Sequence, residues 1–204
     1  MEGSLAPANV DRHQLRASIQ EKYTAVAETP ELGFHFHTGR PLAAMLGYAV
    51  ESVEWLPSTT VDSFAGTGNP FSMGALRPGE VVLDVGCGAG FDSLLAARDV
   101  GPTGRVIAVD MTEAMLQRTR AGAAALGLTQ VETYLGYAEG LPVETGSVDV
   151  VISNGVLNLT PDKMAAVEEI RRVLKPTGRI QIADIVVHRE VPQDARDDID
   201  LWSG

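Results

Sequence analysis

The sequence predicts an α/β domain whose parallel sheet is covered by helices on both faces. From Glu80 onward, short apolar runs alternate with helix-like segments at the spacing of strand–helix–strand units. The first apolar run ends in a glycine-rich turn at residues 86–90, and the second ends on Asp110. The 204 residues and their 45% hydrophobic content suit one domain with a single core.

Residues 1–78 are expected to form a helical and loop segment that covers the active site, and residues 79–204 to form the core. Apolar residues spaced four, four and three apart within residues 10–28 predict an amphipathic helix: Leu15, Ile19, Tyr23 and Val26. Prolines and glycines interrupt residues 29–78, so short helices and loops are expected there.

The core begins with a predicted strand at residues 81–85 and a helix at residues 91–100. Residues 105–109 are predicted to form a second buried strand. Thr112 is suited to cap the next helix, and Gly127 is suited to end it.

Three further strands are predicted at residues 131–136, 148–153 and 179–187. Before the last strand, Thr160 and Pro161 are typical of the first turn of a helix, which is expected to end at Lys175-Pro176. Its buried face is expected to consist of four apolar residues: Met164, Val167, Ile170 and Leu174.

The charge and the cysteine content narrow the range of possible partners and locations. There are 27 acidic and 16 basic side chains, so no broad positive field favours nucleic acid or an anionic membrane surface. Cys87 is the single cysteine, and no apolar run is long enough to span a bilayer. We therefore expect a soluble, cytoplasmic protein.

The glycine turn and Asp110 predict a nucleoside site. Glycines at positions 86, 88 and 90 let a ligand lie against the backbone at a helix N-terminus. Asp110 follows them by about 20 residues, where a carboxylate can accept from both ribose hydroxyls. The alternatives are tight packing for the glycines and a capping carboxylate for Asp110.

Three details favour a cationic methyl donor over a dinucleotide. The glycine pattern is GxGxG and not the GxGxxG of pyrophosphate binding. Asp84 precedes it by two residues, where it can meet an amino group, and the 136–139 segment offers Glu139 to an adenine amino group.

The motifs VLDVGCGAG, AVDMT, GYAEGLP, VDVVISN and RRVLKPTGR resemble, in order, those of class I S-adenosylmethionine-dependent methyltransferases. The resemblance covers roughly residues 80–187 and implies a Rossmann-like parallel sheet and S-adenosylmethionine as cofactor. More narrowly, ISNGVLNLTPDK, LKPTGRIQIADIVV and DLWSG are similar to the arsenite methyltransferase branch.

The resemblance also implies the donor contacts. Asp84, Gly86 and Gly88 would hold the methionine end, with Cys87 packed against the cofactor. Asp110 and Met111 would hold the ribose and adenine, and Asn69 would close over the cofactor from the N-terminal segment. The remaining implied contacts are Ala138 and Glu139 at the adenine, and Asn154 and Gly155 beside the sulfonium.

One departure concerns the acceptor. Arsenite methyltransferases bind trivalent arsenic through cysteine thiolates, and one of these stands where this chain has Gly155. Cys87 alone cannot supply a site of three sulfur atoms. The resemblance therefore favours a small-molecule acceptor other than arsenite, or arsenite methylation by a longer parent chain.

The acceptor side shows only scattered candidates. His188 is a candidate general base because it lies four residues after Asp184, on or just past the last predicted strand. His35 and His37 raise the idea of a metal, but no third ligand is nearby, so we expect none. The other candidates are Arg40, which could equally pair with a surface acid, Trp55, Asn158 and Trp202.

Class I methyltransferases usually close the sheet with an antiparallel hairpin, which this chain is expected to lack. Residues 192–202 suit a short helix and not two strands. An open edge can pair with a second copy, so a homodimer through this edge is one expectation and a frayed edge the other. The competing functions are a non-catalytic module that binds the donor and an NAD-linked oxidoreductase.

Overall fold

The computed structural model describes residues 11–30, 34, 36–188 and 202. Its centre is a five-stranded sheet with the order β3-β2-β1-β4-β5, in which all neighbours are parallel. The strands are β1 (Val81–Val85), β2 (Arg105–Asp110), β3 (Val131–Leu135), β4 (Val148–Asn154) and β5 (Leu174–Ala183). The predicted parallel α/β sheet is confirmed.

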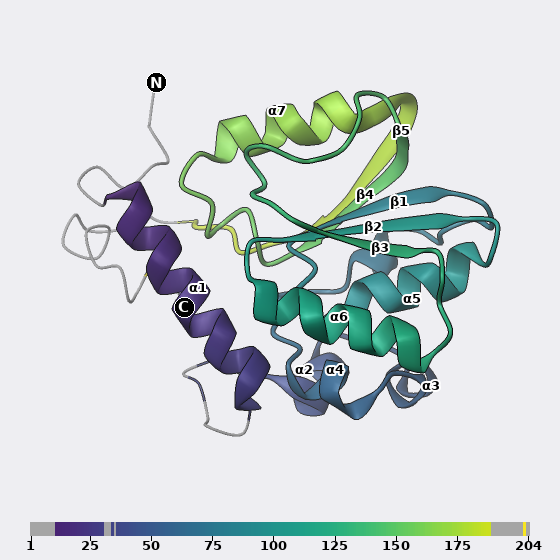
Figure 1. The fold of residues 1–204 in the computed structure, drawn as a ribbon, viewed down its shortest axis with the longest axis horizontal. Helices are drawn as coiled ribbons and strands as arrows, with labels where there is room; N and C mark the ends of the chain where they lie inside the picture. The colour runs from purple at the N-terminus through teal and green to yellow at the C-terminus, as the bar shows by residue number, and fades with distance from the viewer. Residues whose placement is uncertain (1–10, 31–33, 35, 189–201, 203–204) are drawn as a thin grey trace.

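Helices cover both faces of this sheet (Figure 1). The helices α5 (Phe91–Val100) and α6 (Glu113–Ala125) lie on one face, and α7 (Lys163–Val173) lies on the other. The central strands β1 and β4 are buried at most positions because both of their faces are covered. Gly127 ends α6 as predicted, with a φ of 67° that favours glycine.

The N-terminal segment is helical, as predicted. Its long helix α1 (Arg12–Glu28) is capped by Asp11, whose carboxylate accepts from two backbone N–H groups. The short elements that follow are α2 (Gly39–Met45), α3 (Val50–Trp55), α4 (Ser58–Asp62) and the 3₁₀ helix η2 (Pro70–Met73). An aromatic core joins them to α5. The Phe64 and Phe91 rings stack with their centroids 4.0 Å apart, and the Tyr48 ring meets the Phe91 ring edge-on.

The region from residue 160 to 187 differs from the prediction. The helix begins at Lys163 with Asp162 as its N-cap, because the Asp162 carboxylate accepts from the backbone of Ala165 while the Thr160 hydroxyl donates back to Val156. Met164 and Val167 are 65% and 45% exposed. The buried face is instead formed by Ala166, Ile170 and Val173.

The last strand also lies earlier than predicted. The helix ends at Val173, and β5 runs over Leu174–Ala183 with a register shift against β4. Residues 184–187 are outside the strand, and Ile185, Val186 and Val187 are all exposed. The apolar composition of these residues predicted a buried strand, but no strand in the described part of the chain pairs with them. The short helix expected at 192–202 lies outside the described residues, except for Trp202.

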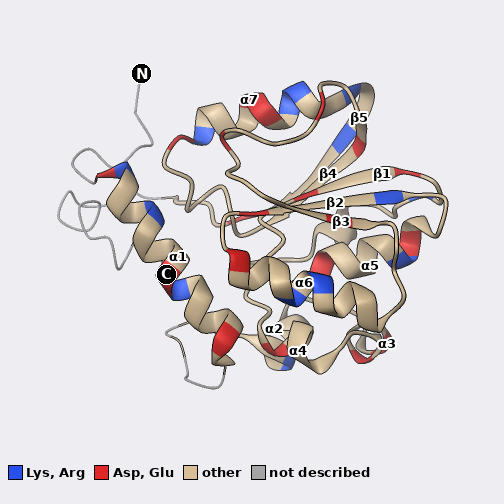
Figure 2. Ribbon diagram, in the orientation of Figure 1, with Lys and Arg blue, Asp and Glu red and all other residues tan. Residues whose placement is uncertain are grey.

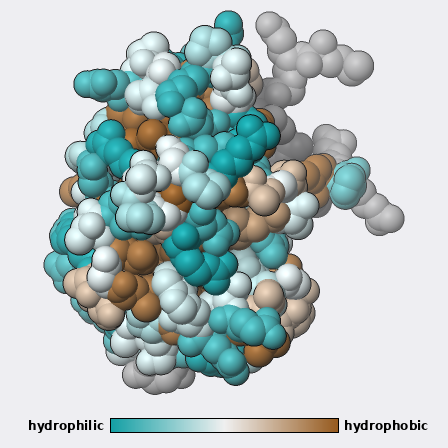
Figure 3. All heavy atoms as spheres, turned by 90° about the vertical axis from the view of Figure 1, so that its right-hand side faces the viewer, coloured by the Kyte–Doolittle hydropathy of each residue, from teal (hydrophilic) through white to brown (hydrophobic). Residues whose placement is uncertain are grey.

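Charge and hydropathy are mixed over the surface. Figure 2 shows acidic and basic positions interspersed on the helices, without a face that is basic alone. Figure 3 views the side opposite α1, where hydrophobic residues form small separate areas among hydrophilic ones. Within the described residues, no helix has the length and apolar character needed to cross a membrane.

Candidate functional site

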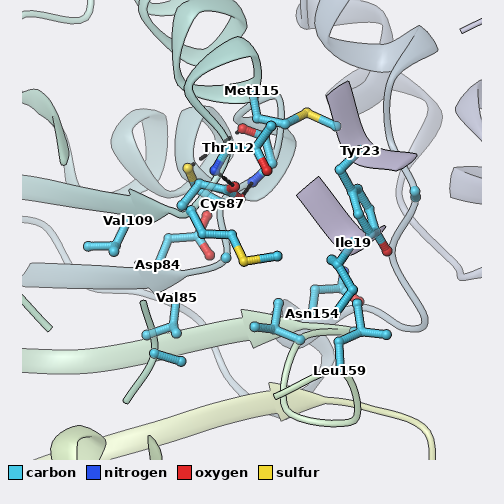
Figure 4. Close-up of a pocket in the computed structure, with 18 of the residues that line it drawn as sticks. Ile19, Tyr23, Asp84, Val85, Cys87, Val109, Thr112, Met115, Asn154 and Leu159 are labelled. Atoms are coloured by element: carbon cyan, nitrogen blue, oxygen red, sulfur yellow. Dashed lines mark hydrogen bonds between the residues drawn. The ribbon is translucent and has the colours of Figure 1, made fainter. Parts of the chain in front are cut away.

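A pocket lies at the carboxyl ends of β1, β2 and β4, where α1 and the loop after α4 cover it. This is the edge at which open parallel α/β sheets bind their ligands. In Figure 4, Ile19 and Tyr23 of α1 face Met115 and Asn154 across the cavity. The N-terminal segment thus contributes one wall and the sheet contributes the other.

The glycine turn after β1 serves both packing and ligand access. Backbone N–H groups of Gly86 and Cys87 donate to the Val109 carbonyl, which ties the turn to β2. A Cβ on Gly90 would meet the Thr119 side chain at 2.9 Å, whereas a Cβ on Gly88 would have open space around it. Packing therefore requires Gly90, and Gly88 leaves room beside the pocket.

Asp110 ends β2 at the same edge. Its two oxygens accept from the backbone N–H groups of Gly88 and Thr112, both at 2.8 Å. Burial raises the pKa of this carboxyl group, and these hydrogen bonds oppose the rise. Thr112 occupies the N-cap of α6, but its hydroxyl makes no capping bond, so Asp110 holds this turn. Each Asp110 oxygen retains a lone pair for a ligand.

Two more buried carboxylates line the pocket. Burial raises the pKa of Asp84 to about 8 and that of Asp92 to about 6, and the neighbouring Asp92 charge adds to the Asp84 shift. Asp84 accepts from the Ser93 hydroxyl at 2.6 Å. None of the ion pairs within the described residues includes Asp84, Asp92 or Asp110. The wall is therefore acidic and without a counter-ion in that part of the chain.

Asn154, at the end of β4, holds the loop that follows α4. Its Oδ1 accepts from the backbone N–H groups of Thr67 (2.8 Å) and Gly68 (3.0 Å). Its Nδ2 donates to the Gly68 carbonyl at 2.8 Å and to Asp92 at 2.9 Å. A Cβ on Gly66 would lie 2.5 Å from the Asn154 amide nitrogen, so only glycine at position 66 allows the loop to come this close to Asn154. Asn154 therefore positions the loop.

Sequence reasoning missed Asp92 and its partner Tyr48, whose hydroxyl donates to Asp92 at 2.7 Å. The signal for Asp92 was an acid in the first turn of α5, which is also an ordinary helix-dipole position. Nothing in the sequence places Tyr48 near it, because the two residues are 44 apart.

Helix α1 contacts the pocket through one face. Gln20 Nε2 donates to the Met111 carbonyl at 2.8 Å, and Arg16 pairs with Glu139 at 2.9 Å. Burial, together with the charges of Asp110 and Asp184, raises the pKa of Tyr23 to about 12. Tyr23 therefore stays protonated at neutral pH.

Comparison with known proteins gives the family. Residues 76–203 match the family model described as methyltransferase domain. The chain belongs to this methyltransferase family. The resemblance to class I S-adenosylmethionine-dependent methyltransferases is thereby confirmed, and their cofactor is S-adenosylmethionine.

Individual relatives agree with this. An arsenite methyltransferase of Halobacterium salinarum is 45% identical over 97% of this chain, which covers 54% of that protein. The chain thus spans about half the length of that relative. An arsenic(III) S-adenosylmethionine methyltransferase from Chlamydomonas reinhardtii has a TM-score of 0.60 at 36% identity, over 76% of this chain and 51% of that one. An S-adenosylmethionine-dependent methyltransferase from Aquifex aeolicus, at 21% identity and a TM-score of 0.52 over 91% of this chain and 80% of that one, shows the fold alone.

The methyltransferase pocket brings together ten of the predicted donor residues: Asp84, Gly86, Cys87, Gly88, Asp110, Met111, Ala138, Glu139, Asn154 and Gly155. Asn69 does not line it, because its Oδ1 accepts from the Phe71 backbone and caps η2. His188 does not line it either and is exposed. Since β5 ends at Ala183, the strand geometry that paired His188 with Asp184 does not apply.

The other acceptor candidates that the structure describes lie outside the pocket lining. Asp184 accepts from the backbone of Leu157 at 2.8 Å and so holds the turn after β4. Arg40 and His37 are exposed, and Trp55 lies against Arg98. The remaining positions are His35, which lies outside the described residues, Asn158, which takes part in the Asp184 turn, and Trp202, whose ring faces the Lys163 ammonium.

Cys87 is a structural cysteine of this methyltransferase. Burial raises the pKa of its thiol, so it is not a thiolate at neutral pH. Gly155 has a φ of 73°, and a Cβ there would meet Thr67 Cγ2 at 2.9 Å. The backbone at position 155 is therefore shaped for glycine.

Proposed function

We propose that this chain binds S-adenosylmethionine in the pocket and transfers its methyl group to a small-molecule acceptor. The observation that carries the proposal is the acidic wall at the carboxyl ends of β1 and β2 and at the start of α5. It consists of the buried carboxylates of Asp84 and Asp92 and the half-buried carboxylate of Asp110, with no ion-pair partner among the described residues. A buried charge without a counter-ion is unfavourable, and a cationic ligand relieves that cost.

The residues fit this donor. Gly88 leaves open space where the amino-acid end would lie against the backbone. Asp84 and Asp92 suit its ammonium group, and Asp110 has lone pairs left for the ribose hydroxyls. Bound there, S-adenosylmethionine supplies an electrophilic methyl group, and its sulfur keeps the electron pair of the broken C–S bond when the acceptor attacks.

The chain's own residues orient the reactants and exclude water. Ile19 of α1 and Leu159 of the turn after β4 add apolar side chains to the pocket lining (Figure 4). Asn154 fixes the loop at residues 66–68, which sets the shape of the acceptor side. No histidine or lysine is among the described residues that line the pocket. We therefore expect an acceptor that attacks through a lone pair available without a protein base.

The similarity to the Halobacterium relative supports a second acceptor, arsenite, for a longer parent chain. In this chain the only thiol is that of Cys87, which is buried and protonated. At the position where the arsenite branch has a ligand, this chain has Gly155. We favour an acceptor other than free arsenite for the chain as given.

Calorimetric titration with S-adenosylhomocysteine tests the donor site, with NAD as the competing ligand. We expect micromolar affinity, and ligand at about 100 times the dissociation constant should stabilise the fold by roughly 2.7 kcal/mol. Methyl transfer to a panel of thiols, oxyanions and arsenicals then separates an enzyme from a non-catalytic module. A folded sample that NAD stabilises and S-adenosylhomocysteine does not would contradict the proposal.

A further inference from the structure

Arg16 of α1 lines the donor pocket, but none of the donor contacts implied by the family involves it. We propose that Arg16 and Glu139 together read the purine edge of the donor and select adenine. This inference rests on the proposed function, because it names the part of the donor that α1 recognises.

The guanidinium of Arg16 is held from two sides. Its Nη2 donates to Glu139 Oε1 at 2.9 Å, and its central carbon lies 4.5 Å from the centroid of the Tyr137 ring. The Arg16 and Glu139 side chains are 25% and 12% exposed. One turn further along α1, Gln20 is bonded to the Met111 carbonyl, which fixes how the helix lies on the core. The orientation of the guanidinium is therefore set before a ligand enters.

One N–H group of this guanidinium has no hydrogen-bond partner among the described residues. Arg16 Nε is buried, and no described residue accepts a hydrogen bond from it. A buried N–H without a partner is unfavourable, and a ligand acceptor can remove that cost. The hydrogen bonds of Glu139 among the described residues engage Oε1 alone, so Oε2 can still accept. The pair thus presents one donor and one acceptor beside Tyr137 and Ala138 in the pocket lining.

This pattern is complementary to adenine. On its N1 edge, adenine carries the N6 amino donor next to the ring-nitrogen acceptor N1, and this is the edge that we assign to the pair. Glu139 can accept from the amino group while Arg16 Nε donates to the ring nitrogen. Hypoxanthine has a carbonyl oxygen in place of the amino group and a hydrogen on N1. The Glu139 carboxylate would therefore face another acceptor, and Arg16 Nε would face another donor. The pair should therefore reject a deaminated donor.

Titration of the full chain with S-adenosylhomocysteine and with its deaminated analogue, S-inosylhomocysteine, tests this directly. The parent should bind the adenosyl ligand roughly 10 to 100 times more tightly than the inosyl ligand. In Arg16→Lys, which keeps the charge but loses the Nε donor, the ratio should fall to less than about 5. Glu139→Gln should lower it as well, because its amide can turn a donor toward the inosyl carbonyl.

Arg12→Ala is the matched control, since Arg12 lies one turn earlier on α1 and pairs with Asp162 at 3.5 Å, outside the pocket lining. This variant should keep the parent ratio. The same ratio in Arg16→Lys as in the parent would overturn the inference, and so would an equal loss for both ligands, because that result indicates helix docking alone. A parent that binds neither ligand would instead overturn the proposed function, and the inference with it.

Discussion

The two sides of the pocket are built by different kinds of contact. On the donor side, Asp110 accepts hydrogen bonds from Gly88 in the turn after β1 and from Thr112 after β2. The ends of two neighbouring strands therefore fix the position of its carboxylate. On the acceptor side, the loop at residues 66–68 is held by Asn154, more than 80 residues away in sequence. The donor side is therefore fixed by the sheet, whereas the acceptor side depends on docking of the N-terminal segment.

The largest effect is expected from Asn154→Ala, which removes the contact that joins the two sides. The loss leaves the Thr67 and Gly68 N–H groups without this acceptor, and among the described residues Asp92 keeps only the Tyr48 hydroxyl as a donor. We expect a loss of roughly 2 to 4 kcal/mol of unfolding free energy and a large loss of methyl transfer. Thermal unfolding of Asn154→Ala and of Asn69→Ala, which removes a local cap only, compares the two. Equal melting temperatures would show that the loop holds without Asn154.

Asp110→Ala should break the donor side alone. The ribose would lose a charged acceptor, so donor affinity should fall by about 1 to 3 kcal/mol, or roughly 5- to 150-fold. The fold should persist, because Asp110 ends a strand and lies outside the apolar core clusters. Titration with S-adenosylhomocysteine measures the effect. A variant that binds as tightly as the parent would show that Asp110 only holds the turn.

The acidic wall also predicts how stability depends on pH. The folded-state pKa of Asp84, about 8, lies above the ordinary aspartate value of 3.8, so the folded protein keeps a proton that the unfolded chain releases. The stability this contributes is complete below the unfolded pKa and is lost as pH rises through about 8. Without donor, the melting temperature should fall by several degrees between about pH 5 and pH 8.5.

Asp84→Asn should remove most of that fall, since the amide does not titrate. Donor binding should also tighten as pH rises, because the ionised wall attracts a cation. Asp62→Asn is the control, being an exposed acid on α4. A parent melting temperature that does not fall over this range, or a fall that Asp84→Asn leaves intact, would show that the wall is not protonated in the unliganded protein.

The same contrast explains what the sequence could predict. The donor side follows from a short motif, because a strand, a glycine turn and a helix occupy consecutive residues and the next strand brings Asp110 beside them. The positions of Asp84, Gly88 and Asp110 at one pocket edge were therefore predictable. Their contacts with a donor remain predictions.

The contacts that join the N-terminal segment to the pocket were less predictable because they are long-range. Tyr48, Asp92 and Asn154 meet only when the N-terminal segment docks, and no local pattern encodes that docking. The error at β5 has a related cause: the apolar run Ile185–Val187 suits a buried strand, but burial depends on a neighbouring strand. The proposed homodimer through that edge and the cytoplasmic location stay predictions.

The smallest effect is expected for arsenite as acceptor, where turnover by this chain should remain close to background. Trivalent arsenic prefers about three thiolates, and Cys87 is one buried thiol that stays protonated. Glutathione can supply the missing sulfur atoms, so methylated arsenic should be measured with and without it. Robust turnover without added thiol would contradict the expectation.

A cysteine at position 155 should not by itself restore the reaction. Gly155→Cys requires a side chain at φ 73° and a contact with Thr67 Cγ2 at 2.9 Å, so the variant should lose on the order of 1 to 2 kcal/mol of stability. The Gly155→Cys, Thr67→Ala double variant removes the contact with Thr67 Cγ2 but keeps the unfavourable φ at position 155. Comparing it with the single variant separates the effect of the steric contact from the effect of the added thiol. If both variants gain arsenite turnover equally, the acceptor side tolerates the thiolate despite its backbone. If only the double variant gains turnover, contact with the docked loop decides which acceptor the pocket admits.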